Sequence, residues 1–562
     1  MLTKSVFLYY NMHQGMNMYD ILIKNGIIVD GFSRQKFRAD IAVADGKVVK
    51  ISQNINETAT KTINAGGQIV VPAFIDSHTH SDILYFKDNE NTTKVSQGIG
   101  TEIVGLCGFS PIHYQSEYNE EIANYNTSVI GHNSLSFNDF TDYKTQLNKS
   151  NPSVNVASFI AHGSLRASVM GYENRPATEQ EIGKMERFVE TAMQQGAVGI
   201  SFGMIYAPGK YTPKEEMIRA SKIVAKYNGI ASFHMRDESK YILDSIDEVV
   251  GISKASGVKA HISHLKVSGS DNVYLADKAL EKIEKLKTKE NICISFDVYP
   301  YAASSTTLLA PLPSFIDIDN LAIEFADKSK REKTIEFFKI RNTQEDFDKI
   351  MISTAPKEFE KYVGRTLSQI GSETSLTSFE TCLFLLSQSK EFGAIFFLQS
   401  QENVDKIVCH EDSIVISDGM IPNPQNTNGV HPRVFGSFAV LLENYVKSEK
   451  LSLEEAIKKI TYMPAKLYSL KGRGSIKVGN YADITIFNLE KVRSLATYSS
   501  PNILPEGFSH TIINGILEIE NGIPTQTHAG KFVMANEEFL QKQYVNSDGN
   551  VFPKKTEYEI QR

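Results

Sequence analysis

Eight apolar, strand-like runs alternate with helix-like segments through the centre of this chain. The runs cover residues 73–80, 101–107, 154–161, 197–202, 229–235, 258–264, 292–298 and 413–418. Apolar residues recur at helical spacing between several of these runs, at 181–195, 214–227, 241–253 and 276–286. Eight alternations over about 350 residues predict a (β/α)8 barrel of the TIM type, in which the chemistry lies at the carboxyl ends of the strands.

Two β-rich segments flank the predicted barrel, and both contain Asn-Gly or Asp-Gly hairpin turns. We expect them to form one small composite β-sandwich built from both chain ends, although two separate sandwiches would give a similar pattern. The gap between the seventh and eighth runs is too long for one crossover and predicts a helical insertion. The expected limits are 1–17 for a leader, 18–72 and 471–525 for the sandwich, 73–470 for the barrel, about 319–410 for its insertion and 526–562 for a tail.

Composition limits the classes of partner. The chain has 562 residues with 59 basic and 66 acidic side chains, a net charge of −7, and no long basic block, so we do not expect it to bind nucleic acid. No apolar run reaches the roughly 18 residues that a membrane helix needs. The four cysteines have no paired short spacing. These features predict a cytoplasmic protein.

Two histidines end the first strand-like run. His78 and His80 are two residues apart, so both project to the same face if the strand continues through them. A pair of surface histidines in a loop would have the same spacing. The apolar residues before them and the neighbouring carboxylates of Asp76 and Asp82 favour a site for a cation such as Zn²⁺.

Further candidate ligands end other runs. Cys107 lies between nearby glycines at the end of the second run, which favours an accessible thiolate over a buried inert thiol. His234 ends the fifth run, where a satisfied core histidine is the alternative. The sixth run offers His261 and His264, which have opposite parity; we expect His264 to be the ligand and His261 to be structural, on the outer face.

The eighth run ends at Asp418, where a carboxylate is costly unless it pairs or reacts. A helix N-cap is the alternative role, and we favour a general base that also contacts metal. Five ligands exceed one tetrahedral site, so they could hold one tight zinc ion alone or together with a weaker second one, with Cys107 central. Lys266 and Arg433 near this set indicate an anionic substrate, unless both are ordinary solvated surface residues.

The order of these motifs resembles the amidohydrolase superfamily, and within it the D-aminoacylase or N-acyl-D-amino-acid deacylase family. The matching pieces are FIDSHTH at 74–80, GLCGFS at 105–110, GIS at 199–201, YAPG at 206–209, SHLK at 263–266, DVYPY at 297–301, SDG at 417–419 and HPR at 431–433. The resemblance implies hydrolysis of N-acyl-D-amino acids by metal-activated water. The implied residues are Cys107, His234 and His264 for the tight zinc, His78 and His80 for the weaker site, Asp418 as acid and base, and Lys266, Tyr299, Ser305, Arg433 and Tyr206 for the substrate.

Two sequence features separate this chain from related patterns. Leu106 stands where the family usually has Asn before the motif cysteine. The fourth run, 197–202, does not end in the lysine with which cyclic amidases bridge two metals, which argues against a hydantoinase- or dihydroorotase-like enzyme. A third possibility is a barrel that has lost its chemistry and serves as a binding protein, but none of the expected ligands is missing.

Overall fold

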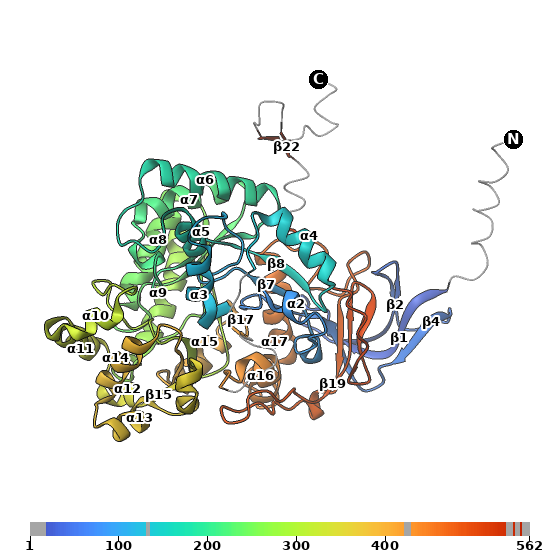
Figure 1. The fold of residues 1–562 in the computed structure, drawn as a ribbon. Helices are drawn as coiled ribbons and strands as arrows, with labels where there is room; N and C mark the ends of the chain where they lie inside the picture. The colour runs from blue at the N-terminus through green and yellow to red at the C-terminus, as the bar shows by residue number, and fades with distance from the viewer. Residues whose placement is uncertain (1–17, 131–134, 421–428, 536–542, 546–550, 554–562) are drawn as a thin grey trace.

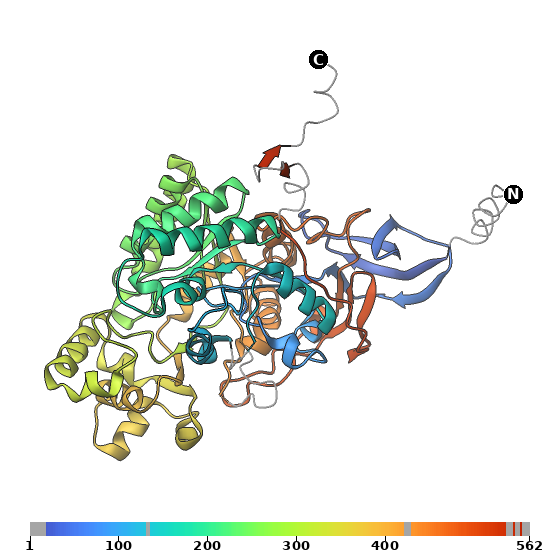
Figure 2. The same cartoon turned by 45° about the horizontal axis from the view of Figure 1, so that its top comes forward.

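The structure is a computed structural model that describes residues 18–130, 135–420, 429–535, 543–545 and 551–553 (Figure 1). The expected leader, 1–17, lies outside the described residues. A barrel occupies the centre of the molecule, a β-rich unit lies at one end, and a mainly helical lobe lies at the other (Figures 1 and 2). Among the described residues, no helix has both the length and the apolar character needed to cross a membrane.

Eight parallel strand positions form the barrel, as the sequence predicts. In order they are β6 (Phe74–Asp76), β7 (Ile99–Val104), β8 (Asn155–Ser158) continued by β9 (Ile160–Ala161), β10 (Gly199–Gly203), β11 (Ile230–His234), β12 (Lys259–Ile262), β13 (Ile294–Val298) and β17 (Ser413–Val415). The ring closes just beyond β6 and β17, where His80 N donates to Gly419 O at 2.8 Å and Asp418 N donates to His78 O at 2.9 Å. The closure therefore joins two of the predicted site segments directly.

The helices after the strands cover the outside of the barrel. The four predicted helices are α6 (Glu179–Gln194), α7 (Lys214–Lys226), α8 (Ile242–Ser256) and α9 (Leu275–Glu290). Helix α6 illustrates why they form. Its first turn is closed by a capping box between Thr178 and Glu181, and its buried residues recur at helical spacing on one face. Those residues are Met185, Phe188, Val189, Ala192 and Met193.

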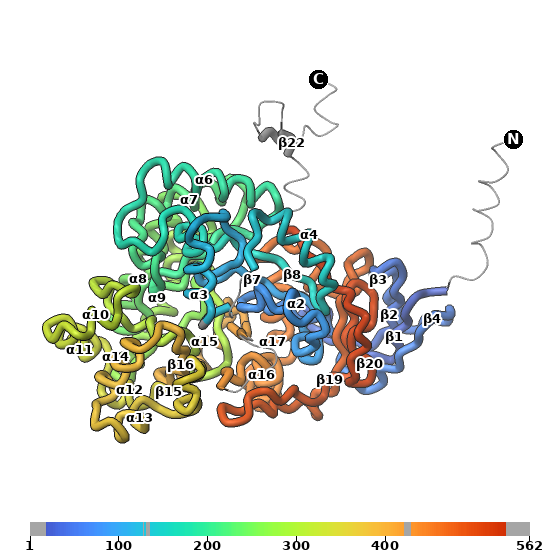
Figure 3. The backbone as a smooth tube through the Cα atoms, viewed as in Figure 1, coloured from blue at the N-terminus to red at the C-terminus, as the bar shows by residue number. Residues whose placement is uncertain are grey.

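Both chain ends contribute to one sheet, which confirms the composite β unit. The strands from the start of the chain are β1 (Tyr19–Ile28), β2 (Phe37–Ala44), β3 (Lys47–Ser52), β4 (Ala59–Asn64) and β5 (Ile69–Pro72). Those from the far end are β18 (Ile484–Phe487), β19 (Phe508–Ile513), β20 (Ile516–Glu520) and β21 (Ile523–Pro524). Antiparallel pairing of β5 with β18 joins the two sets, and the tube in Figure 3 shows the blue and red segments side by side.

The insertion after β13 has a core of its own but is not purely helical. Its helices are α10 (Leu321–Ala326), α11 (Lys328–Arg341), α12 (Gln344–Asp348), α13 (Leu367–Thr374) and α14 (Ser378–Gln388). A three-stranded antiparallel sheet completes it, with β14 (Ser304–Thr307), β16 (Gly393–Phe396) and β15 (Ile350–Thr354). The sequence predicted a helical insertion, but α12 ends at Asp348 and β15 begins two residues later. Phe338, Phe347 and Phe379 pack together beneath these elements.

The chain continues to pack on the barrel after residue 525, within the segment expected to be a tail. Val156 of β8 donates to Lys531 O at 2.9 Å, and Val533 N donates to Val156 O at 2.8 Å. Phe532, between them, is buried. Beyond Ala535 the described residues form only β22 (Gln543–Val545) and β23 (Val551–Pro553).

Candidate metal centre

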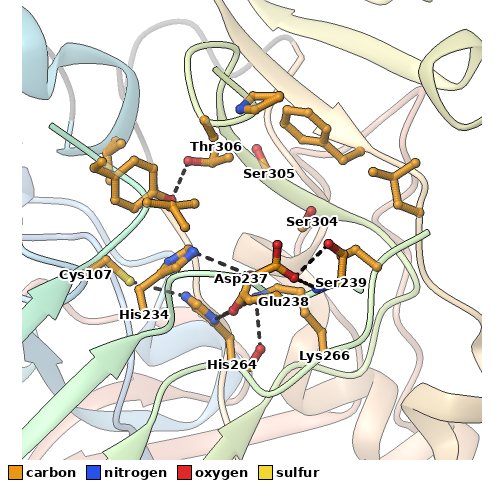
Figure 4. A pocket seen from close by; sticks show the side chains of 18 of the residues that line it. Cys107, His234, Asp237, Glu238, Ser239, His264, Lys266, Ser304, Ser305 and Thr306 are labelled. Atoms are coloured by element: carbon orange, nitrogen blue, oxygen red, sulfur yellow. Dashed lines mark hydrogen bonds and ion pairs between the residues drawn. The ribbon is translucent and has the colours of Figure 1, made fainter. Parts of the chain in front are cut away.

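The five candidate ligands converge at the carboxyl ends of the barrel strands. Cys107 Sγ lies 3.3 Å from His78 Nε2 and 3.3 Å from His264 Nε2. The ligand atoms of His78, His80 and Cys107 lie within 4.8 Å of one another, as do those of Cys107, His234 and His264. All five side chains are buried. Figure 4 shows Cys107, His234 and His264 pointing toward one another from separate elements.

Unusual backbone conformations aim several of these side chains. Cys107, His264 and Asp418 have φ values of 53°, 36° and 48°, in the left-handed region that non-glycine residues seldom adopt. Each follows the end of its strand, so a turn rather than the strand pleat directs its side chain into the site. Such conformations persist where the surrounding structure holds them, and they cluster at functional sites. A Cβ added at Gly203 would lie 2.0 Å from Cys107 O, so this glycine permits the close approach.

The expectation that His261 faces outward was wrong. His261 is fully buried, with Nε2 2.9 Å from Asp297 Oδ2 and Nδ1 2.8 Å from Ser295 Oγ. The parity argument failed because β12 ends at Ile262 and the chain turns before His264. Strand alternation therefore does not relate the two histidines, and both lie close to Asp297.

Asp297, at the end of β13, organises three histidines. Its Oδ2 lies 3.2 Å from His78 Nδ1 and 2.9 Å from His261 Nε2, and its Oδ1 accepts from the backbone N–H of His264. Burial alone would raise the pKa of this carboxyl, but His78 and His261 hold it below its usual range. A carboxylate on Nδ1 leaves Nε2 of His78 directed at Cys107, which is a common arrangement behind a metal-binding histidine. Asp297 begins the DVYPY piece at 297–301, and its type and spacing alone predicted no role for it.

Glu238 is a second acidic residue with no predicted role that contacts the candidate ligands. Its Oε1 lies 3.1 Å from His264 Nδ1 and 2.7 Å from Lys266 Nζ, and its Oε2 lies 3.4 Å from His234 Nε2. Burial would raise its pKa, but Lys266 and His234 hold it well below the usual range. Figure 4 shows Glu238 between His264 and Lys266. Its position four residues after His234 was the available sequence signal.

The donor set fits a zinc ion. Nitrogen and sulfur donors are those that zinc prefers, and burial excludes competing water. Nδ1 of His234 and Nδ1 of His80 make no hydrogen bond among the described residues, and Nε2 of His234 has the 3.4 Å contact with Glu238. Burial alone would raise the pKa of the Cys107 thiol, but His78 and His264 hold it well below its usual range, which favours the thiolate that metals bind. The two overlapping ligand groups also fit a second ion that shares Cys107.

Asp418 faces this centre from the far side. Its Oδ1 lies 3.2 Å from His80 Nε2 and 3.6 Å from His78 Nε2, and its Oδ2 lies 2.8 Å from Arg433 Nη1. Burial would raise the pKa of Asp418, but Arg433 is the main group that holds it well below the usual range. The carboxylate is therefore ionised at neutral pH and able to accept a proton.

Four of the five predicted substrate residues line one cavity of about 540 Å³. Tyr206, Ser305, Lys266 and Arg433 line it together with Asp418. Tyr206 bonds Thr306 Oγ1 at 2.8 Å, and Arg433 Nη2 donates to Ser305 O at 3.1 Å. One wall comes from the barrel and the other from the insertion, so the substrate residues reach the same space from elements far apart in sequence.

Tyr299 alone among the predicted substrate residues does not line the cavity. Its ring lies beside two cationic side chains of the cavity. The ring centroid is 4.7 Å from the guanidinium of Arg433 and 6.0 Å from Lys266 Nζ. Its hydroxyl accepts from Gln399 Nε2 at 3.0 Å. In this structure Tyr299 supports the cations rather than facing the cavity.

Sequence comparison now adds the family. The model of the Amidohydrolase family matches residues 61–309 and 431–517, more than half of the chain. The chain belongs to the amidohydrolase family. Among its relatives, D-aminoacylase of Alcaligenes xylosoxydans xylosoxydans is 29% identical over 521 residues, covering 91% of this chain and 97% of the relative. N-acyl-D-glutamate deacylase of the same organism is 29% identical over 497 residues, covering 88% and 93%.

Solved structures of similar proteins agree with this amidohydrolase assignment. N-acyl-D-glutamate deacylase from Bordetella bronchiseptica, in complex with zinc and a phosphonate mimic of the tetrahedral intermediate, has a TM-score of 0.80 at 27% identity and covers 92% of this chain and 100% of its own. A D-aminoacylase structure has a TM-score of 0.79 at 28% identity, covering 92% and 99%. A D-hydantoinase, with a TM-score of 0.53 at 13% identity, shares the fold alone.

Proposed function

We propose that this amidohydrolase is a zinc-dependent enzyme that cleaves the amide bond of N-acyl-D-amino acids to a carboxylate and a free D-amino acid. The observation that carries the proposal is the convergence of Cys107, His234 and His264 on one buried point opposite the ionised Asp418. The names of the similar enzymes supply the substrate class and its D configuration, because no distance in the site selects a hand.

In this proposal Cys107, His234 and His264 hold the tight zinc, and His78 and His80 complete a weaker second site. Zinc bound there would act as a Lewis acid that polarises the amide carbonyl and makes a water molecule more acidic. A similar D-aminoacylase is described as having a binuclear centre activated by one metal and attenuated by the second. For this chain we propose one tight and one weak metal site.

Asp418 is the proposed general base and acid. Arg433 keeps its carboxylate ionised, so Asp418 can accept a proton from the attacking water and return it to the leaving nitrogen. Lys266, Arg433 and Ser305 lie around the same cavity, where they would bind the α-carboxylate of the substrate. Tyr206 lies on the same wall, with its ring centroid 4.9 Å from that of His234.

A cyclic amidase is the alternative function, and one contact argues against it. Such enzymes bridge two metals with a lysine at the end of the fourth strand. Here β10 ends at Gly203, where an added Cβ would lie 2.0 Å from Cys107 O. A lysine cannot be accommodated at that position without moving the strand ends apart.

Hydrolysis of matched substrates by the zinc-loaded protein tests the proposal. We expect release of free amino acid from N-acetyl-D-leucine and not from N-acetyl-L-leucine, and no opening of a hydantoin ring. The Asp418→Asn variant should lose about 10²- to 10⁴-fold in kcat, the usual contribution of a general acid or base. It should retain its zinc, which separates loss of the base from loss of the metal. Equal activity on both enantiomers, or an Asp418→Asn variant with near-normal kcat, would contradict the proposal.

A further inference from the structure

One cation in the cavity wall has no carboxylate partner among the described residues. The lining cations are Lys210, Arg236, Lys266, Arg341 and Arg433. Four of them form ion pairs, with Glu248 at 3.0 Å for Arg236, Glu238 at 2.7 Å for Lys266, Asp237 at 3.5 Å for Arg341 and Asp418 at 2.8 Å for Arg433. Within the described chain, Lys210 forms no ion pair, and its ammonium lies 5.4 Å from the ring centroid of Tyr211.

The backbone of Lys210 is fixed to segments that carry the site. Its N–H donates to Tyr206 O at 2.7 Å, and its carbonyl accepts from Arg236 Nη1 at 2.8 Å. Tyr206 packs against the ring of His234, and Arg236 follows His234 by two residues. The backbone of Lys210 is therefore anchored to Tyr206 and Arg236, and its side chain lines the same cavity as His234.

The surroundings of Lys210 leave its charge uncompensated. Burial lowers the pKa of Lys210 to about 8, and no carboxylate of the described residues raises it. At neutral pH the side chain is still largely protonated, so a partly desolvated positive charge faces the cavity without a counter-ion in the part of the chain that the structure describes. Asp244 also lines the cavity, but it is exposed and forms no ion pair among the described residues. An anionic group on a bound molecule would offset this cost.

The geometry points to Lys210 as a specificity residue: we propose that it binds a second anionic group of the substrate, so that the cavity accepts N-acyl-D-amino acids with a carboxylate in addition to the α-carboxylate. This inference rests on the proposed function. The second carboxylate can belong to an acidic amino-acid side chain or to a dicarboxylic acyl group. Leu312, Phe338 and Phe347 from the region of the insertion also line the cavity, which suits the methylene groups between two charges.

Steady-state kinetics on four substrates test the assignment. N-acetyl-D-leucine is the neutral reference, N-acetyl-D-glutamate and N-acetyl-D-aspartate carry the charge on the side chain, and N-succinyl-D-leucine carries it on the acyl group. Each is assayed with the zinc-loaded wild type and with the variants Lys210→Met and Lys210→Arg. The matched control is Lys222→Met, which removes an exposed lysine from α7.

We expect Lys210→Met to lower kcat/KM about 10- to 100-fold for one of the doubly anionic classes, as befits loss of a charged hydrogen bond. The change should fall mainly on KM, since Lys210 does not touch the reacting atoms. N-acetyl-D-leucine should change by less than about twofold, Lys210→Arg should restore most of the loss, and Lys222→Met should behave as wild type. The class that responds, side chain or acyl group, identifies the source of the second carboxylate.

A binding measurement separates recognition from catalysis. Calorimetry of zinc-loaded Asp418→Asn should show tighter binding of the doubly anionic substrate than of N-acetyl-D-leucine, and the added Lys210→Met substitution should abolish the difference. Equal losses on neutral and anionic substrates, or a wild type that prefers the neutral one, would overturn the role of Lys210 while leaving the proposed function intact. A wild type that hydrolyses none of the N-acyl-D-amino acids would end both.

Discussion

Lys94 carries a fully buried positive charge between β6, β7 and β17. Its ammonium lies 3.0 Å from Asp76 Oδ2 and 2.9 Å from Glu102 Oε1. Burial alone would lower the pKa of Lys94, but Glu102 and Asp76 raise it to about 12, so the residue stays charged. Asp76 also accepts hydrogen bonds from the backbone N–H and the hydroxyl of Ser417, the residue before Asp418. The network therefore connects the barrel closure to the candidate site.

Replacing Lys94 with methionine keeps most of the side-chain length and removes the charge. Asp76 and Glu102 would then lie buried without their counter-ion, and Thr79 Oγ1 and Ser417 Oγ, at 3.2 Å and 3.4 Å, would lose a donor. Removing one partner of a buried ion pair costs about 3–5 kcal/mol. At about 1.4 kcal/mol per factor of ten, the unfolding constant should rise by roughly two to three and a half orders of magnitude.

Urea unfolding of the zinc-loaded protein measures this change in the unfolding constant. The unfolding is followed by circular dichroism because the chain has no tryptophan. The exposed Lys222→Met is the control and should shift the free energy of unfolding by less than about 0.5 kcal/mol. The double variant Lys94→Met/Glu102→Gln, which removes one of the stranded charges, should be more stable than Lys94→Met alone. The reasoning about the buried charge is wrong if the free energy of unfolding of Lys94→Met lies within about 1 kcal/mol of the wild-type value. It is also wrong if the double variant is no more stable than Lys94→Met.

Two further predictions concern the buried side chains of Asp297 and Lys459. The variant Asp297→Asn replaces the ionised acceptor that contacts His78 and His261. Its zinc affinity, measured by competition with a chelator, should fall about 10- to 100-fold. An unchanged affinity would count against a supporting role for Asp297. Burial lowers the pKa of Lys459 to about 8 from 10.5, so the unfolded chain binds more protons between these pH values. The free energy of unfolding should therefore rise from pH 8 to 10.5 by about 2–3 kcal/mol more in the wild type than in Lys459→Met; parallel curves would refute this.

Several features of the fold and site could be predicted from the sequence because they depend on local residue patterns. Apolar periodicity is set by which face of a strand or helix is buried, so the barrel strands and helices α6–α9 lie close to their predicted ranges. Residues at strand ends share one rim of a parallel barrel, so His78, Cys107, His234, His264 and Asp418 could be expected near one another. The structure brings all five to one buried centre.

Other predictions were wrong because they depended on where a strand ends. His261 was placed outside on the assumption that β12 runs unbroken to His264, and a left-handed turn after Ile262 removed that parity. The insertion was expected to be helical, but β15 and β16 find their pairing partners only once the chain has folded back. Neither a turn of this kind nor a non-local strand pair leaves a periodic signal in the sequence.

The amino-acid sequence by itself determined the barrel, the composite sheet and the identity of the candidate ligands, since residue type and spacing along single strands carry that information. Only the tertiary structure decided which charges meet: Asp297 with His78, Glu238 with Lys266, Lys94 with two carboxylates, and Lys210 with none among the described residues. Ion pairs form between residues tens to hundreds of positions apart. Their partners are set by how the strands close around the barrel, which makes charge pairing a property of the assembled fold.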